Sequence, residues 1–458
     1  MFDPRKALQK LFSAPAEALE RTIEFAEHEE KGMMNKKPLQ LAGEYFNTLG
    51  PGLTTGAADD DPSGIGTYSQ TGAQFGFQLL WLSIFTFPLM AMVQEMCARI
   101  GLVTGEGLAA NILKHHSRRA LYFITILLFA ANTLNIAADL GAMSASTTLL
   151  FPRLNLAFVL VALALVSLFL QIFTTYARYA RFLKYTALAL LSYVFTAFAV
   201  HIDWLDALHH TFIPSFTFSK DQVFLLCAIL GTTISPYLFF WQTSQEVEED
   251  ILKGQRTIAQ RKAAVDQKGI NRMRIDVWTG MFVSNLIMFF IIAACAATLH
   301  ANGITTIATA DQAASAIRPF GGELTYFFFA LGIIGTGLLA VPVLAGSAAY
   351  AISECFGWKQ GLYRKLKEAY AFYGVIIVSM LVGIIANFAH LDPIKGLIYS
   401  AVANGLVAPI VLFYIVRMSA NKKIMHGQKN HPLITAFGWL TTVLMVASGI
   451  AAVASLFF

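Results

Sequence analysis

Charged residues are scarce in this sequence. Asp, Glu, Lys and Arg make up 13% of its 458 residues, about half the share found in soluble domains. Hydrophobic residues make up 56%, and the 37 phenylalanines are far more than a single soluble core would bury. This composition excludes an ordinary soluble enzyme, a disordered chain and a nucleic-acid-binding domain. It predicts an all-α protein that crosses a lipid bilayer several times.

Cysteines and catalytic motifs are also scarce. The four cysteines form no CxxC pair and none has a histidine nearby, so none is expected to bind zinc. No HExxH or GxSxG motif is present, and the pairs His115-His116 and His209-His210 are expected to be solvated side chains in loops. The chain is therefore not expected to be an enzyme or to hold a cofactor.

Eleven stretches are apolar over about the 20 residues that a membrane helix needs. They cover residues 42–74, 77–100, 120–149, 155–173, 183–201, 222–245, 276–299, 325–353, 370–389, 394–416 and 432–456. Residues 1–40 are polar and of mixed charge, and an amphipathic surface helix is expected at 15–29, because Pro15 is tolerated in a first helical turn.

Lysine and arginine are distributed unevenly among the connecting segments. If the N-terminus is cytoplasmic, 29 of the 33 basic residues lie in cytoplasmic segments, and only Arg153, Lys220, Arg318 and Lys395 lie outside. Membrane proteins retain positive residues on the cytoplasmic side. The distribution predicts a cytoplasmic N-terminus and an extracytoplasmic C-terminus in a plasma membrane, which in a prokaryote is the inner membrane.

Two of the predicted spans are interrupted. In the first, Pro62 lacks an amide hydrogen and lies between Gly56 and Gly64; in the sixth, Gly231 and Pro236 are five residues apart. Broken helices at matching places in two halves indicate the binding site of a transporter. Because these spans are five apart, two repeats of opposite topology are expected. The expected divisions are a segment 1–40, a first repeat 41–203, a second repeat 204–417 and a last span 432–458.

Carboxylates are predicted inside the membrane. Asp59, Asp60 and Asp61 lie at the first break, and Asp139 lies within the third span. Intramembrane charge is costly and is by default functional. Spans one and six contain no Lys or Arg, so these acids imply a bound cation. A polar stripe on the third span either continues the ion path or forms interhelical hydrogen bonds; it comprises Asn132, Asn135, Asp139 and Ser146.

These residues resemble the Nramp family of divalent-metal transporters. The likeness is carried by Gly50-Pro51-Gly52-Leu53, Asp61-Pro62-Ser63-Gly64, residues 98–105, Ala138-Asp139-Leu140 and Leu344-Ala345-Gly346. The resemblance implies a LeuT-type fold with a 5+5 inverted repeat and an eleventh helix. It also implies that helices 1 and 6 are broken and that a metal ion binds between them.

The sequence departs from the family at its metal-binding positions. The family's Asn, Met and His fall on Gly64, Ser235 and Tyr237, the third-helix Glu falls on Ala142, and the tenth-helix Gln falls loosely on Ala401, one turn from Asn404. This combination looks like the Nramp-related magnesium transporters. Without the soft thioether, an all-oxygen site remains, which suits Mg²⁺ and also Mn²⁺.

The resemblance implies a site centred on the Asp61 carboxylate. The other residues expected at the ion are Ala58, Gly64, Thr232 and Ser235, and those expected along its path are Asp59, Asp60, Thr233, Tyr237, Asn404 and Asp139. The expected function is transport of Mg²⁺ or Mn²⁺ by alternating access without proton coupling, because neither Tyr237 nor Ala142 is a proton carrier near neutral pH. The expected partners are the ion and the bilayer, with no nucleic acid; the oligomeric state stays open.

Three alternatives stay open. A proton-coupled Mn²⁺ or Fe²⁺ symporter has the same fold, although Tyr237 and Ala142 argue against it. An amino-acid permease would meet a substrate carboxylate with three repelling Asp side chains. A membrane signalling protein is an alternative of another class.

Overall fold

The described part of the chain is built from helices. The computed structural model describes residues 45–46, 49–217, 219–307, 310–389 and 393–455, and these contain no strand. The chain divides into two compact parts, Met1–Leu49 and Gly50–Phe458. In the first part, the N–H of Leu49 donates to the Phe46 carbonyl at 3.3 Å. The amphipathic helix expected at 15–29 lies outside the described residues.

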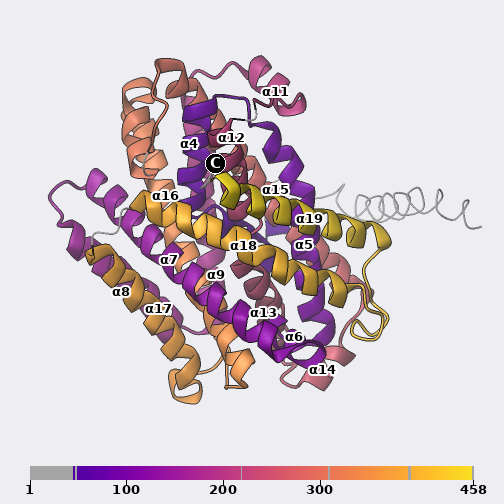
Figure 1. Cartoon of the computed structure of the whole chain (residues 1–458). Coiled ribbons are helices and arrows are strands. Elements are labelled where there is room, and N and C mark those ends of the chain that lie inside the picture. The colour runs from indigo at the N-terminus through magenta and orange to yellow at the C-terminus, as the bar shows by residue number, and fades with distance from the viewer. Residues whose placement is uncertain (1–44, 47–48, 218, 308–309, 390–392, 456–458) are drawn as a thin grey trace, which may run out of the picture. The chain divides into compact units, whose positions relative to one another are not determined.

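The second part is a bundle of long helices with short connecting helices (Figure 1). In chain order they are α3 (Pro51–Asp59), α4 (Pro62–Phe75), α5 (Trp81–Thr104), α6 (Leu108–His115), α7 (Arg118–Leu150), α8 (Leu156–Phe173), α9 (Tyr176–Thr186), η1 (Ala187–Leu190), α10 (Leu191–Ala199), α11 (Trp204–Phe212), α12 (Lys220–Thr233), α13 (Pro236–Leu252), α14 (Ile258–Ala263), α15 (Gln267–Thr298), η2 (His300–Asn302), α16 (Ala310–Phe356), η3 (Leu366–Glu368), α17 (Tyr370–Phe388), α18 (Pro393–Ser419) and α19 (Pro432–Ser455).

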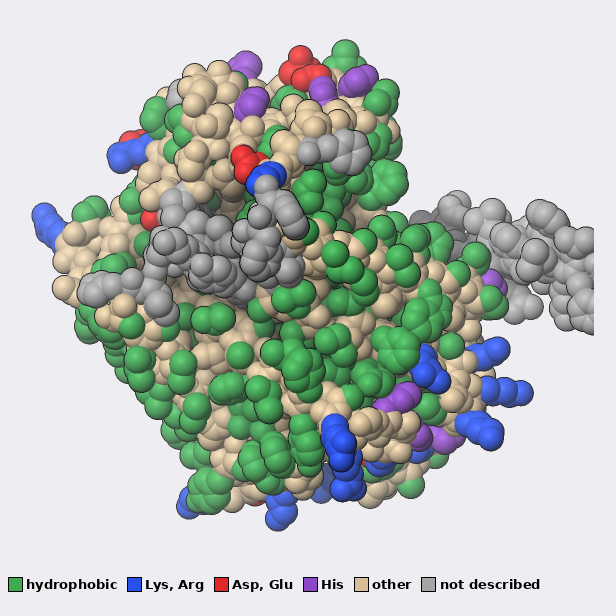
Figure 2. All heavy atoms as spheres, viewed as in Figure 1, with side chains coloured by type: hydrophobic (Ala, Val, Ile, Leu, Met, Phe, Trp, Pro, Cys, Tyr) green, Lys and Arg blue, Asp and Glu red, His purple; other side chains and the backbone are tan. Residues whose placement is uncertain are grey.

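Among the described residues, nine of the predicted spans correspond to a helix or a pair of consecutive helices that is long and apolar enough to cross a membrane. The first predicted span is instead divided into the short helices α3 and α4, and the tenth has its apolar part at Ala403–Ser419. In the apolar 18-residue stretch of α8, only 28% of the residues are buried inside the protein. In the corresponding stretch of Lys220–Leu252, 83% of the residues are buried. The broken sixth span is therefore central and α8 is peripheral. Figure 2 shows hydrophobic side chains across the middle of the face in view.

Both predicted breaks are confirmed. The first span leaves the helical conformation at Asp60 (φ −84°, ψ 49°) and resumes at Pro62. The sixth leaves it at Ile234 (φ −113°, ψ 57°) and resumes at Pro236. Each second half thus begins with a proline, whose missing N–H costs nothing at a first helical position.

Glycines bring α3 into close contact with α15. Gly52 and Gly56 lie one turn apart on α3, and a methyl group added at Gly56 would overlap the backbone of Gly280. A methyl group added at Gly280 would in turn overlap the backbone at Gly52. Small residues at this spacing allow membrane helices to pack backbone against backbone. The first half-helix is therefore closely packed along α15.

Asp276 of α15 caps the start of α3. Its carboxylate accepts hydrogen bonds from the backbone N–H groups of Gly50 (2.8 Å), Gly52 (2.7 Å) and Leu53 (3.1 Å). These are among the donors that a helix N-terminus leaves without an intrahelical partner. No sequence pattern predicted this cap, because its partners are more than 200 residues apart.

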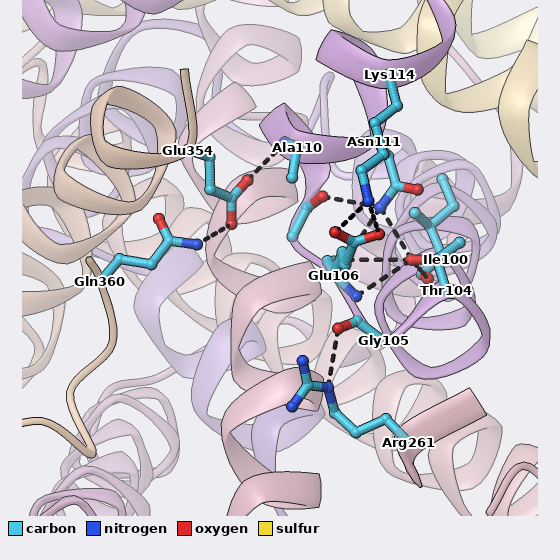
Figure 3. Close-up of polar contacts among 11 residues, drawn as sticks. Ile100, Thr104, Gly105, Glu106, Ala110, Asn111, Lys114, Arg261, Glu354 and Gln360 are labelled. Atoms are coloured by element: carbon cyan, nitrogen blue, oxygen red, sulfur yellow. Dashed lines mark hydrogen bonds and ion pairs between the residues drawn. The ribbon is translucent and has the colours of Figure 1, made fainter. Parts of the chain in front are cut away.

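The two ends of the bundle have different connections. α6 and α14 lie at one end and α11 at the other (Figure 1). At the α6 end, the Glu354 carboxylate accepts from the N–H of Ala110 and from Gln360, each at 2.9 Å, and Arg261 donates to the Gly105 carbonyl at 2.9 Å (Figure 3). These bonds link the last turn of α16 to α6, and α14 to the turn after α5.

One expectation about local structure is wrong, and another needs a detail added. The eighth span is confirmed at Gly322–Phe356, and a non-helical Gly322 (φ 79°) separates it from the preceding helical stretch of α16, which begins at Ala310. His209 and His210 lie on the short helix α11 rather than in an irregular loop. Asp203 caps that helix, accepting from the N–H groups of Leu205 and Asp206, each at 3.1 Å.

Candidate metal site at the two helix breaks

Asp61 is the most extensively bonded carboxylate at the first break. Its Oδ1 accepts from the Ser63 hydroxyl at 2.6 Å and from the Gly64 N–H at 2.7 Å, so it caps α4. Its Oδ2 accepts from Nδ2 of Asn135 on α7 at 2.8 Å. Asp61 is 2% exposed. Its position and orientation are therefore fixed from two helices.

The polar stripe on α7 faces the break and the neighbouring α16. Asp139 accepts from the Ser63 N–H at 3.2 Å, next to the Asn135 bond just described. Asn132 instead donates to the Leu344 carbonyl at 2.9 Å and to the Ser347 hydroxyl at 2.8 Å, both on α16. Interhelical hydrogen bonding is thus confirmed for Asn132, whereas Asn135 and Asp139 contact the break and their part in an ion path stays a prediction.

Tyr237 connects the two breaks. Its hydroxyl donates to the Ala58 carbonyl at 2.7 Å, from the first turn of α13 to the end of α3. The Ala58 carbonyl, expected as an ion ligand, therefore already accepts a hydrogen bond; a carbonyl oxygen has a second lone pair for an ion.

The hydroxyls of the sixth span bond within their own helix. The Ser235 hydroxyl donates to the carbonyls of Gly231 (2.9 Å) and Thr232 (2.7 Å). The hydroxyls of Thr232 and Thr233 donate to the Ile229 carbonyl at 3.1 and 2.8 Å. Each hydroxyl thereby keeps oxygen lone pairs that accept a cation or a water molecule.

Asp59 and Asp60 complete the acidic cluster and differ in their partners. Asp59 Oδ2 accepts from the Ser284 hydroxyl of α15 at 3.0 Å. Asp60 is 0% exposed, and neither of its oxygens has a hydrogen-bond partner within the described part of the chain. A buried carboxylate without donors is costly unless a cation or water meets it. Asp60 is therefore the acid of the three that most needs a cation.

Gly64 lies where a side chain would enter the site. A Cβ added there would lie 3.2 Å from the Asp59 carbonyl, 3.4 Å from Asp61 Oδ1 and 3.6 Å from the Tyr68 ring. The glycine therefore lets the backbone of α4 lie close against Asp59 and Asp61, and a side chain there would press on the Asp59 carbonyl. Tyr68, whose buried hydroxyl has no described hydrogen-bond partner, was not predicted as a site residue.

Asn404 and Ser146 have no described hydrogen bond to the acidic cluster. Asn404 is 3% exposed on α18, and its Oδ1 has no described partner, as is also true of the Ser146 hydroxyl. Ser63, Asn135 and Ser284 are the groups that hold the acids. Of these, Asn135 had a sequence signal in the polar stripe and Ser63 lies within the motif Asp61-Pro62-Ser63-Gly64, whereas no pattern pointed to Ser284.

The fold and these breaks define a class. Two central helices, each interrupted at mid-length and five spans apart, with buried acids between them, are the features of LeuT-type membrane proteins. Solved structures agree: an Eremococcus coleocola manganese transporter matches at a TM-score of 0.69 and 18% identity, covering 92% of this chain and 89% of that one. The nucleobase-cation-symport-1 transporter Mhp1 matches at a TM-score of 0.50 and 14% identity, and the match covers 89% of this chain and 91% of Mhp1.

Sequence comparisons identify the family within that class. The family model described as natural resistance-associated macrophage protein-like, Nramp, matches residues 52–455, so this chain belongs to the Nramp family of integral membrane proteins. The divalent metal cation transporter MntH of Pectobacterium carotovorum is 26% identical over 411 residues, 88% of this chain and 92% of that protein. The divalent metal cation transporter MntH of Klebsiella pneumoniae is 25% identical over 410 residues, which are 87% of this chain and 92% of that protein.

Proposed function

We propose that this protein transports Mg²⁺, and also Mn²⁺, through the site between the two helix breaks. The donor chemistry of that site carries the proposal. Every side chain bonded to Asp61 or to the Ala58 carbonyl is a hydroxyl or an amide, and Ser235 stands where the family has a methionine. An oxygen-only set suits hard ions that prefer octahedral oxygen ligands, and it offers no sulfur to a soft metal.

Asp61 and its neighbours would hold the ion with part of its water shell. Mg²⁺ gives up water reluctantly and is commonly held by one or two carboxylates plus waters. Asp61 and Asp60 supply negative charge, whereas the carbonyl and hydroxyl oxygens at Ala58, Thr232 and Ser235 accept hydrogen bonds from bound water. The lack of a side chain at Gly64 leaves the Asp61 carboxylate uncovered by that residue. Alternating exposure of this site to the two sides of the membrane would complete transport.

The proposed transport is not coupled to protons. Tyr237 donates its hydroxyl to the Ala58 carbonyl, and free phenols lose their proton only near pH 10. Ala142, three residues after Asp139, carries no ionisable group. A proton relay would therefore lack the sixth-helix His and the second acid of the third-helix pair that the family resemblance implies, and only Asp139 of that pair remains.

The proposed orientation places the N-terminus in the cytoplasm. Its support is the bias of Lys and Arg, 29 of 33 on one side. In Figure 2 most Lys and Arg side chains in view lie toward the lower end, away from α11. We assign 41–203 and 204–417 as the inverted repeats. Bacterial relatives support a location in the inner membrane.

Ion uptake by proteoliposomes tests the proposal. Vesicles containing the full chain are loaded with a Mg²⁺ indicator or a Mn²⁺ indicator, and uptake is compared with that of empty vesicles. Uptake of both ions at millimolar concentration, without preference for Cd²⁺, is expected. Exclusion of Mg²⁺ with rapid Mn²⁺ uptake would overturn the proposal in favour of a manganese carrier like the Eremococcus coleocola manganese transporter.

A further inference from the structure

The short helix α11 carries a histidine and carboxylate cluster outside the proposed transport site. Asp206, His209 and His210 occupy positions i, i+3 and i+4 of this helix. Residues at that spacing lie next to one another on one helical face. In Figure 2 histidine and acidic side chains gather at the end of the molecule where Figure 1 places α11. The cluster is thus formed by one nine-residue element.

The geometry of the cluster matches a chelating site. One ligand atom from each of the three side chains lies within 4.8 Å of the other two. Oδ1 of Asp206 is 3.2 Å from Nδ1 of His210, which also lies 3.1 Å from the Asp206 carbonyl oxygen, so an ion bound at this nitrogen would replace that hydrogen bond. Two ligands bound at about 2.0–2.1 Å to a tetrahedral ion lie roughly 3.3 Å apart. These two atoms are therefore already at the separation that a shared ion requires, and small side-chain rotations bring the third to the same ion.

Further potential ligands surround the cluster. Asp206 and His210 line a cavity of about 410 Å³ between α11, the end of α4 and the end of α15. His201, Asp203 and His300 line the same cavity. Asp206 and His209 are exposed and His210 is half-buried, so an ion in solution reaches them. A cavity rich in imidazole and carboxylate groups provides outer partners for a bound metal.

The helix that bears the cluster is held firmly. Trp204, its first residue, packs against Phe198 with ring centroids 5.4 Å apart and against Phe290 at 6.4 Å. Ala207 is fully buried, and Asp203 caps the helix. Binding at α11 therefore needs little ordering of the backbone, which favours affinity.

We propose that Asp206, His209 and His210 form a binding site for a borderline transition-metal ion such as Zn²⁺. Imidazole nitrogen is a ligand of Zn²⁺, Ni²⁺ and Co²⁺, whereas Mg²⁺ is bound through oxygen. Two histidines and one carboxylate leave coordination positions open for water. The site is separate from the oxygen-lined site at the helix breaks and selects a different class of metal.

Zinc titration of the full-length protein tests this proposal. The purified, tag-free protein in detergent is titrated with Zn²⁺ by calorimetry in the presence of excess Mg²⁺, which occupies oxygen sites. The unmodified chain is expected to bind about one equivalent. The double variant H209A/H210A is expected to bind at least about tenfold more weakly, the loss of two of three ligands.

Two control variants distinguish this site from others. H115A/H116A removes the other histidine pair, which belongs to no cluster of three ligands among the described residues, and is expected to bind zinc normally. D61A, at the helix breaks, is also expected to retain zinc binding. Thermal unfolding of each variant shows whether it is folded. Three results would each overturn the proposal and leave only a surface ion pair. They are equal zinc binding by H209A/H210A and the unmodified chain, no zinc binding by the unmodified chain up to about 1 mM, and loss of zinc binding in D61A.

Discussion

At the residue scale, the three adjacent aspartates have different surroundings. Asp61 has donors on both oxygens, Asp59 accepts from Ser284, and Asp60 has no described partner. A carboxylate fixed by several donors is preorganised and gains a cation without reorganising its partners. Asp61 is therefore expected to define the ion position, while Asp60 adds charge close to it.

Replacement of Asp61 is expected to abolish transport. D61A removes the fixed carboxylate, and uptake of Mg²⁺ and Mn²⁺ in proteoliposomes should fall at least tenfold with the protein still folded. D60A, which breaks no described hydrogen bond, should retain measurable uptake and serves as the matched control. Normal uptake by D61A together with loss in D60A would show that Asp60 is the principal ligand.

Restoring the family residues is expected to change the metal preference. In G64N/S235M the asparagine enters the space beside Asp61 Oδ1, 3.4 Å from the position of its Cβ, and the methionine adds sulfur at the second break. Competition by Cd²⁺ should therefore strengthen relative to that by Mg²⁺. G64N alone adds only an amide and should not increase Cd²⁺ competition. An equal increase in both variants would contradict the role of sulfur.

At the element scale, the contact between α3 and α15 depends on glycine. Gly52 and Gly56 place the α3 backbone against Gly280, and Asp276 of α15 caps the start of the same half-helix. No side chain separates the two backbones there. The position of α3, and with it Asp59 and the Ala58 carbonyl, is therefore set by α15.

A single added methyl group is expected to disturb this contact. G56A would force α3 away from α15, and overpacking of this kind costs about 1–3 kcal/mol. The control G374A places a methyl group on a helical glycine of α17 with nothing within 4 Å. Thermal unfolding should show a lower midpoint for G56A and an unchanged or higher one for G374A. Equal midpoints would mean that the helices separate without cost.

Sequence patterns predicted the breaks but not the contacts that hold them. Pro62, Pro236 and the aspartates are visible because proline and charge are rare inside apolar spans. The cap by Asp276 and the contact at Gly280 join residues more than 200 positions apart, and nothing in either segment specifies its partner. The α11 cluster was missed because its helix is too short and polar to stand out from a loop.

At the scale of the whole molecule, charge and membrane potential favour inward movement of a divalent ion. A divalent ion gains about 4.6 kcal/mol per 100 mV when it crosses the full field. A membrane potential of this size is enough to accumulate the divalent ion without coupling to protons. A carrier without proton coupling can thus still take up divalent ions, driven by the membrane potential.

Metal uptake is expected to leave the pH of the vesicle lumen unchanged. Proteoliposomes with an internal pH dye take up Mg²⁺ while valinomycin and K⁺ clamp the potential. A flat pH trace alongside clear ion entry is expected, because Tyr237 and Ala142 provide no relay. Acidification in proportion to uptake would instead assign this chain to the proton-coupled carriers. Uptake that rises with a more negative interior would show that net charge moves.

The unpartnered carboxylate of Asp60 has a kinetic consequence. When the site is empty, the Asp60 carboxyl group is buried without a cation, which is costly, whereas a bound divalent ion meets that need. The return of the empty carrier is then slower than the passage of the loaded one. Ion placed on the far side of the membrane removes that slow step, since each carrier returns loaded. One-for-one exchange of labelled ion should consequently be faster than net uptake, and the ratio of the two rates measures the cost of leaving the site empty.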